Sequence, residues 1–177
     1  MKFIVAVASV ALQVTDVQAQ GALDPPCQSS VSRQIAFASR TAKDSLTVSI
    51  GPGACHSATL SIVVTSSRGK VLYRYVALFK KHVATQWDDP ELPQLARDFL
   101  NETASHALVS KGDRPVPKPA DQAEEGDAVL TVPAPVFARL ASRGQPMLYH
   151  PTYYEGGQYV VYDPATRTAR VVAQWGV

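Results

Sequence analysis

The sequence contains 177 residues, of which 46% are hydrophobic, and its 17 Lys and Arg against 15 Asp and Glu give a formal net charge of +2. It has no basic block and no stripe of alternating basic and aromatic residues, which argues against a nucleic-acid-binding protein. The length suits one domain with a substantial hydrophobic core.

Residues 1–19 are typical of a secretion signal. Lys2 supplies a positive charge, residues 3–12 form an apolar run, and Val17-Gln18-Ala19 suits cleavage before Gln20. The run is shorter than the roughly 20 residues that a membrane-spanning helix needs. We therefore expect a signal peptide at 1–19 and a single domain at 20–177, without a transmembrane segment, in the bacterial periplasm or secreted. A buried N-terminal strand or helix is the alternative.

Two cysteines occur, Cys27 and Cys55. An even number of cysteines in an oxidising compartment predicts a disulfide, here across a separation of 28 residues. The alternatives are a cysteine nucleophile and a zinc ligand. A nucleophile needs a base within reach, but neighbouring side chains such as His56 point to opposite faces in extended chain. Zinc is disfavoured because no paired Cys or His spacing is present.

Alternating apolar and polar residues predict the first strands. In ATLSIVVT, for example, Leu60, Ile62 and Val64 share one face, which is typical of a half-buried strand. We expect an antiparallel meander of three or four strands at residues 34–38, 46–50, 58–65 and 71–79.

A helix is expected from residue 90 to about residue 107. Asp88 followed by Glu91 resembles a capping box, and Pro90 suits the first helical turn. Phe99 belongs to a set of apolar residues at helical spacing, so one face of the helix should pack on the sheet. Trp87 precedes the helix, where it either packs against the helix or contacts a partner.

The second half begins with a polar loop at residues 110–127, which contains three prolines and many charges. A strand at 128–132 and a short helix at 135–142 should follow. A second meander is predicted from strands at 147–154, 158–163 and 168–175, with turns at 155–157 and 163–166. The fold class is therefore α+β, mainly antiparallel sheet in two meanders with one or two helices packed on it.

A cluster of tyrosines marks the second meander. Residues 148–162 (LYHPTYYEGGQYVVY) hold five of the seven tyrosines, and Trp175 of the last strand is expected beside them. Aromatic side chains offer large, rigid contact areas with a polar tip and are enriched at interfaces. We predict a partner-binding surface formed by Tyr153, Tyr154, Glu155, His150 and, from the segment before the helix, Trp87. The alternative is that the tyrosines fill the sheet.

No catalytic residue, cofactor or metal site is assigned. The sequence lacks a nucleophile elbow, a phosphate-binding loop and a dinucleotide-binding motif. Asp88, Asp89 and Glu91 lack the alternating oxygen donors of a calcium loop. His106 is interpreted as a half-buried residue on the apolar side of the helix, whereas His150 among the tyrosines could titrate near neutral pH.

These patterns favour a non-enzymatic binding module of the bacterial envelope. Its most concrete form is an inhibitor or immunity-like protein that blocks a secreted or periplasmic enzyme, because small exported domains with a disulfide and without catalytic motifs often present a rigid surface. The first alternative is a hydrolase-type enzyme that uses His150 or His82 as its base. The second is a structural component of the envelope.

Overall fold

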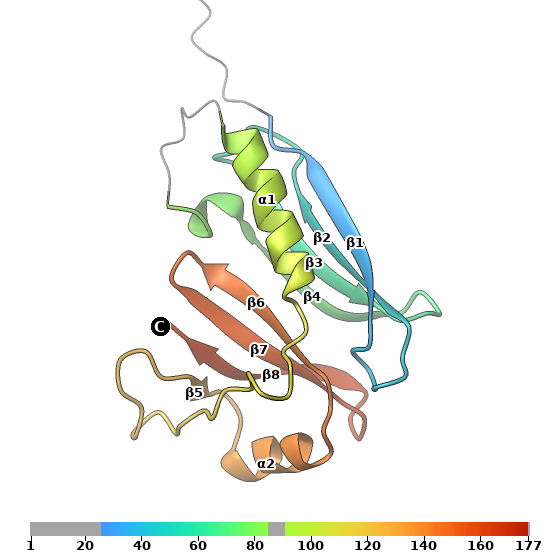
Figure 1. The fold of residues 1–177 in the computed structure, drawn as a ribbon, viewed down its shortest axis with the longest axis vertical. Helices are drawn as coiled ribbons and strands as arrows, with labels where there is room; N and C mark the ends of the chain where they lie inside the picture. Colours follow the sequence, from blue (N-terminus) through green and yellow to red (C-terminus); the bar gives the residue numbers. More distant parts are fainter. Residues whose placement is uncertain (1–25, 85–90, 177) are drawn as a thin grey trace, which may run out of the picture.

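Two four-stranded antiparallel sheets make up most of the protein (Figure 1). The computed structural model describes residues 26–84 and 91–176. The elements are β1 (Ser29–Ile35), β2 (Asp44–Ile50), β3 (Thr59–Thr65), β4 (Val71–Leu78), the 3-10 helix η1 (Phe79–Lys81), α1 (Leu92–Ser105), β5 (Val129–Leu130), α2 (Ala134–Ser142), β6 (Met147–Tyr153), β7 (Gly156–Asp163) and β8 (Thr168–Trp175). The α+β class with two meanders is confirmed.

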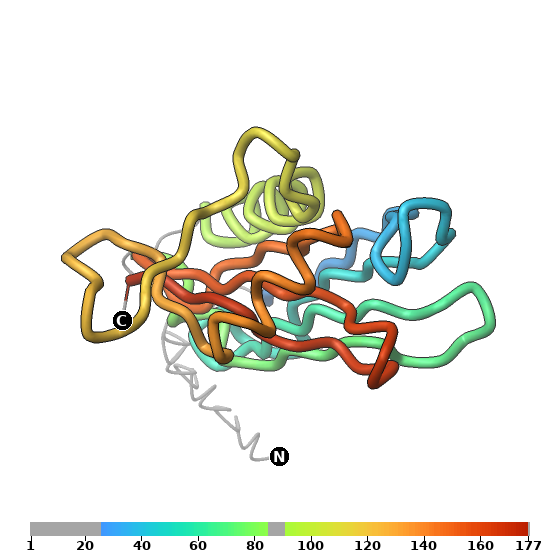
Figure 2. The backbone as a smooth tube through the Cα atoms, turned by 90° about the horizontal axis from the view of Figure 1, so that it is seen from below, coloured from blue at the N-terminus to red at the C-terminus, as the bar shows by residue number. Residues whose placement is uncertain are grey.

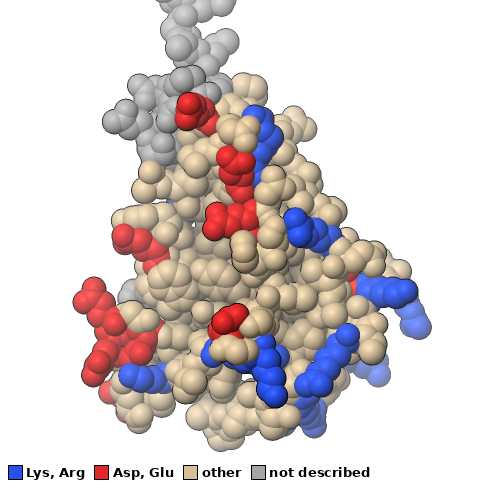
Figure 3. Space-filling model, viewed as in Figure 1, with Lys and Arg blue, Asp and Glu red and all other residues tan. Residues whose placement is uncertain are grey.

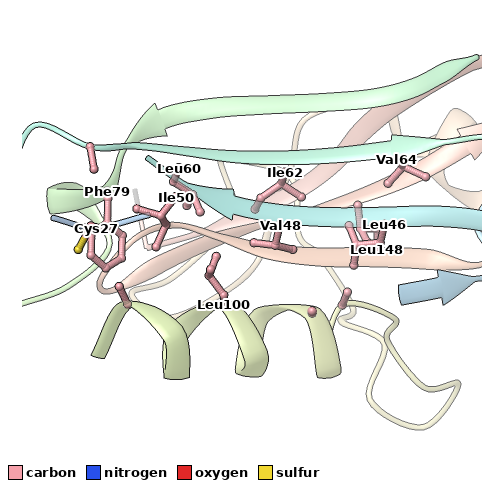
Figure 4. Close-up of a cluster of buried hydrophobic side chains, with 14 of the residues drawn as sticks. Cys27, Leu46, Val48, Ile50, Leu60, Ile62, Val64, Phe79, Leu100 and Leu148 are labelled. Carbon is pink, nitrogen blue, oxygen red and sulfur yellow. The ribbon is translucent and has the colours of Figure 1, made fainter. Parts of the chain in front are cut away.

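The first sheet has the strand order β1-β2-β3-β4 and two unlike faces. Val48 pairs with Ile62, and Ile62 pairs with Tyr75, so these side chains share the inner face. Figure 4 shows the buried side chains of β2 and β3 gathered above α1, with Leu148 of β6 beside them. The outer face carries mostly Ser and Thr, which explains the alternation seen in the sequence.

The first strand begins earlier in the chain than its sequence pattern predicts: we expected residues 34–38, but β1 spans Ser29–Ile35. Its residues Ser30 and Ser32 are polar and exposed because β1 is an edge strand. The chain leaves the sheet afterwards because the buried Asp44 carboxylate accepts hydrogen bonds from the backbone N–H groups of Phe37 and Ala38, at 3.2 and 2.7 Å.

The helix α1 covers β1 and β2 on the inner face of the first sheet. Its buried residues recur at helical spacing and are Leu92, Ala96, Leu100, Thr103 and Ala104. The expected helix from 90 to about 107 is observed over Leu92–Ser105. The start signals at Asp88 and Pro90 lie outside the described residues.

The second sheet, in the order β5-β8-β7-β6, is covered on both faces. Leu148 and Val160 point inward and join the core of the first sheet. Met147 and Val172 point outward and pack with Leu140 of α2 in a second cluster. One sheet therefore links the two hydrophobic clusters.

A buried carboxylate anchors α2 to this sheet. Asp163, whose side chain is 0% exposed, binds Arg139 through two hydrogen bonds of 3.1 and 2.7 Å, and Arg170 lies 3.4 Å away. The hydrogen bonds from Arg139 hold the pKa of Asp163 low, at about 2. The arginine pair thus keeps Asp163 ionised at the predicted turn after β7.

The polar segment at residues 110–127 contains neither a helix nor a strand, as expected. A bridge between Lys118 and Val129 ties it to the sheet, and an ion pair of 2.7 Å joins Lys118 to Asp127 within the loop. Figure 2 places the later part of this loop and the C-terminus at one end of the molecule. The β1–β2, β3–β4 and β7–β8 connections lie at the other end.

The expected disulfide between Cys27 and Cys55 is present, and both residues are buried. It joins the chain before β1 to the turn before β3, where the Cys27 N–H also donates to the Gly53 carbonyl at 3.0 Å. Such a bond is compatible with an exported protein. Within the described residues, the structure has no helix with the length and apolar character needed to cross a membrane. The proposed signal peptide, residues 1–19, lies outside the described residues.

Candidate functional site

Two adjoining hollows lie where the end of α1 meets the outer face of the second sheet. The larger has a volume of about 500 Å³ and the smaller about 230 Å³, and both are lined by His106 and Tyr149. Tyr159 and Trp175 line the larger hollow, whereas Tyr153 and Tyr154 line the smaller. We call this pair of hollows the aromatic groove.

Pairing between β6, β7 and β8 brings these rings together. Tyr149 pairs with Tyr159, and Gly157 pairs with Trp175, so all of these positions share the outer face. The rings of Tyr149 and Tyr159 have centroids 5.2 Å apart, and those of Tyr153 and Tyr154 are 6.1 Å apart. The groove is therefore lined by contiguous aromatic surface.

Two glycines make room for the rings. A Cβ at Gly156 would collide with the ring of Tyr153, and a Cβ at Gly157 would collide with the ring of Tyr149. The sequence pattern predicts both glycines in a turn, but they begin β7, and the turn consists of Tyr154 and Glu155. Their role here is close packing under an aromatic ring rather than turn formation.

The phenol groups of Tyr149 and Tyr154 stay neutral at ordinary pH. Burial raises the pKa of Tyr149, and a hydrogen bond with Trp175 acts in the opposite direction. Hydrogen bonding to the Glu155 carboxylate, together with its charge, raises the pKa of Tyr154. These hydroxyls therefore remain available as hydrogen-bond donors as well as acceptors.

His150 does not lie on this surface. Its side chain faces the interior between the two sheets, and the residue is 1% exposed. Its Nδ1 lies 2.8 Å from the Pro151 carbonyl, which can only accept, so Nε2 is free to accept from the Tyr73 hydroxyl at 2.6 Å. Gln158 Nε2 donates to the same hydroxyl at 2.6 Å. Because the ring is buried, we do not include His150 in the proposed binding surface.

His82 lies near the smaller hollow but is only 4% exposed. Its Nδ1 is 3.1 Å from the Leu78 carbonyl and its Nε2 is 3.2 Å from the Tyr75 hydroxyl, which also lies 3.1 Å from the carbonyl of Thr152. Burial is the main cause that lowers the pKa of both histidines, and it brings that of His150 to about 4. Their hydrogen bonds join β4 to η1 and β6.

The structure brings some predicted site residues together and separates others. Tyr153 and Tyr154 line the smaller hollow, and Tyr154 is 58% exposed. Glu155 lies beside them in a neighbouring depression. Trp87 lies outside the described residues. Among the described residues, no group of three or more His, Cys, Asp or Glu is arranged to hold a metal ion.

Sequence reasoning missed the contribution of α1 to the groove. Glu102 and His106 are one helical turn apart and line the smaller hollow from the end of the helix. Their spacing was visible in the sequence, but the docking of this end of α1 against β6 was not. His106 was expected to be half-buried and is exposed.

Comparison of the chain with protein-family models, with curated proteins and with solved structures found no match in any of the three.

Proposed function

We propose that this protein is an exported binding module of the bacterial envelope and that it recognises its partner through the aromatic groove. The observation that carries the proposal is the set of exposed and half-exposed aromatic rings around two adjoining hollows. Ligand sites are concave and lined mainly by apolar and aromatic side chains with a few polar groups. Tyr and Trp are also the residues that most often dominate binding energy at protein interfaces.

The partner we propose is a secreted or periplasmic protein, most concretely an enzyme that this chain inhibits. The turn of Tyr154 and Glu155 presents an exposed aromatic ring next to a carboxylate, and β6 and β7 support it on both sides. A rigid, exposed aromatic anchor is suited to filling a partner's pocket, because little conformational entropy is lost on binding.

The alternative of a hydrolase with a histidine base has less support. His150 and His82 are both almost fully buried, and hydrogen bonds hold them to Tyr73 and Tyr75. A general base must come within hydrogen-bond distance of the proton that it removes. No particular observation favours a structural component of the envelope.

The proposal is tested by comparing capture by matched variants. The oxidised mature chain, Tyr154→Ala, Trp175→Ala and Val76→Ala are immobilised, and an envelope extract is passed over each. Val76 is the control because it is 51% exposed but lies on the outer face of the first sheet. We expect one protein to bind the wild type and Val76→Ala in stoichiometric amount and to be lost from both aromatic variants.

Activity then tests the inhibitor interpretation. If the captured protein is an enzyme, the wild-type chain should lower its kcat/KM, and Tyr154→Ala should do so at least tenfold less effectively. Equal capture by all four chains would contradict the proposed surface. If the captured enzyme keeps its full activity, the proposal of a binding module stands, but the inhibitor interpretation is contradicted.

A further inference from the structure

We propose that the aromatic groove takes a cationic segment of the partner, an extended peptide that carries Lys or Arg side chains. This inference rests on the proposed function and specifies the chemistry of the ligand. It starts from a third depression of about 350 Å³ that adjoins the groove and shares Tyr153 and Trp175 with it. The three depressions form one continuous surface around the same rings.

Carboxylates surround this surface. Glu102 lines the smaller hollow and Asp113 the larger, and the third depression is lined by Glu124, Glu125, Asp127 and Glu155. No Lys or Arg is found among the described residues that line the three depressions. Asp127 has a cationic neighbour in Lys118, at 2.7 Å, and Asp113 accepts a hydrogen bond from Ser110. The surface keeps an excess of negative charge although the whole chain is slightly positive.

Several Lys and Arg side chains lie at the other end of the molecule, whereas Lys81 lies beside the Tyr154 turn, where its carbonyl accepts a hydrogen bond of 2.9 Å from the Tyr154 N–H. The connections at that end carry Arg40, Lys43, Arg68, Lys70 and Arg167. Figure 3 shows the same separation on one face, with carboxylates mainly on the left around a tan area and Lys and Arg mainly on the right. Such a separation attracts a cationic ligand to one end and repels an anionic one.

Aromatic rings beside carboxylates favour Lys and Arg side chains as ligands. The face of an aromatic ring attracts a cation, and the aliphatic stem of Lys or Arg can cover the ring while its charged end reaches a carboxylate. The rings of Tyr153 and Trp175 lie between the groove and the acidic depression, so one side chain could make both contacts. An acidic peptide would gain neither contact.

The length of the surface favours a peptide over a small cation. A small cation would occupy one depression, whereas the carboxylates come from α1, from the loop before β5 and from the turn between β6 and β7. An extended chain advances about 3.3 Å per residue and presents successive side chains to different points. Several positive side chains could therefore be bound by the carboxylates of different segments.

The test uses three fluorescein-labelled decapeptides that alternate glycine with arginine, with citrulline or with glutamate. Citrulline keeps the shape of arginine without its charge. Binding to the full oxidised chain is measured by fluorescence anisotropy at low and high salt. We expect the arginine peptide to bind at least about tenfold more tightly than the citrulline peptide, and its affinity to fall as the salt concentration rises. The glutamate peptide should not bind.

Matched variants assign the binding to this surface. Glu124→Gln/Glu125→Gln should lower the affinity for the arginine peptide roughly fivefold, and Trp175→Ala should lower it as well. The control is Asp98→Asn/Asp121→Asn, which removes two exposed charges that do not line the three depressions. We expect this control to bind like the wild type.

Several outcomes would overturn the inference. These are equal affinity for the arginine and citrulline peptides, equal weakening by the control pair, or no effect of Glu124→Gln/Glu125→Gln. If the wild type forms dimers and Glu124→Gln/Glu125→Gln does not, the surface binds the basic end of a second copy of this chain and not a partner peptide. If the arginine peptide fails but capture still depends on Tyr154 and Trp175, the proposed function stands and only the cationic ligand is wrong.

Discussion

His150 shows how burial can determine the protonation of a single residue. The ring lies between the sheets, with Tyr73 and Gln158 on Nε2 and the Pro151 carbonyl on Nδ1. The ring centroid of Tyr75 is 4.5 Å away. Burial disfavours the charged ring, and the charge of His82 acts in the same direction. The fold therefore holds His150 neutral well below neutral pH.

This gives a prediction for stability against pH. The pKa of His150 falls from 6.5 in the unfolded chain to about 4 in the fold, so between these values the unfolded state binds more protons. The contribution of neutral His150 to the free energy of unfolding is fully present above pH 6.5. It decreases by roughly 3 kcal/mol as the pH falls towards 4. Urea denaturation at several pH values measures this change. The lowered pKa of His82 acts in the same direction.

A non-titrating variant isolates the contribution of His150. His150→Gln should be less stable than the wild type at pH 7, because buried hydrogen bonds are disturbed, but its stability should fall less steeply towards pH 4. Parallel pH curves for the wild type and His150→Gln would contradict the prediction.

At the scale of elements, α1 depends on one stripe of side chains. Leu100 is 0% exposed and packs into the core under β2, whereas Leu95 on the same helix is 38% exposed. We predict that Leu100→Ala lowers the free energy of unfolding by about 2–5 kcal/mol, because it removes buried surface and leaves a cavity. Leu95→Ala should cost less than about 1 kcal/mol in the same urea titration. Similar losses would mean that α1 is docked differently.

The disulfide joins two segments at the beginning of the first sheet. Cys27→Ser/Cys55→Ser should lower the free energy of unfolding by about 3.5 kcal/mol, because the bond closes a loop with a separation of 28 residues in the unfolded chain. Reductant should lower the stability of the wild type by a similar amount and should leave the double variant unchanged. A wild-type stability that does not respond to complete reduction would contradict this prediction.

The elements with strong periodicity were predictable from the sequence. Strands β2 and β3 alternate strictly between buried and half-buried residues, and α1 repeats its apolar residues at helical spacing. Strand β1 was misplaced because its edge position needs few apolar residues, and because the Asp44 carboxylate ends it through tertiary hydrogen bonds. A strand was expected at 128–132, but β5 is only two residues long, Val129–Leu130.

The candidate site was predictable only in part. The density of tyrosines pointed to β6 and β7, and the turn with Tyr154 and Glu155 is exposed. The direction of His150 was not predictable, because both faces of the second sheet are covered and alternation alone does not say which face meets the first sheet. The acidic surface required the loop before β5 to approach Trp175, a contact between distant parts of the chain.

At the scale of the whole molecule, the two sheets share one hydrophobic core. Leu148 of β6 and Val160 of β7 belong to the same buried cluster as Val48 and Ile62 of the first sheet. Tyr73 of β4 is hydrogen-bonded to His150 and Gln158 across the interface. If one sheet unfolded alone, it would expose this cluster and leave buried polar groups without partners. We therefore predict that both sheets unfold in one cooperative transition.

Unfolding of a Trp87→Phe variant can test this, because Trp175 is then the single tryptophan and reports on β8. Its fluorescence transition in urea should coincide with the far-UV circular dichroism transition of the whole chain. Leu148→Ala should move both transitions together by about 2–5 kcal/mol, and it should raise the hydrogen exchange of β2 and β3 amides as much as that of β7 and β8 amides. Separate midpoints, or a loss of protection confined to the second sheet, would show that the two sheets are independent folding units.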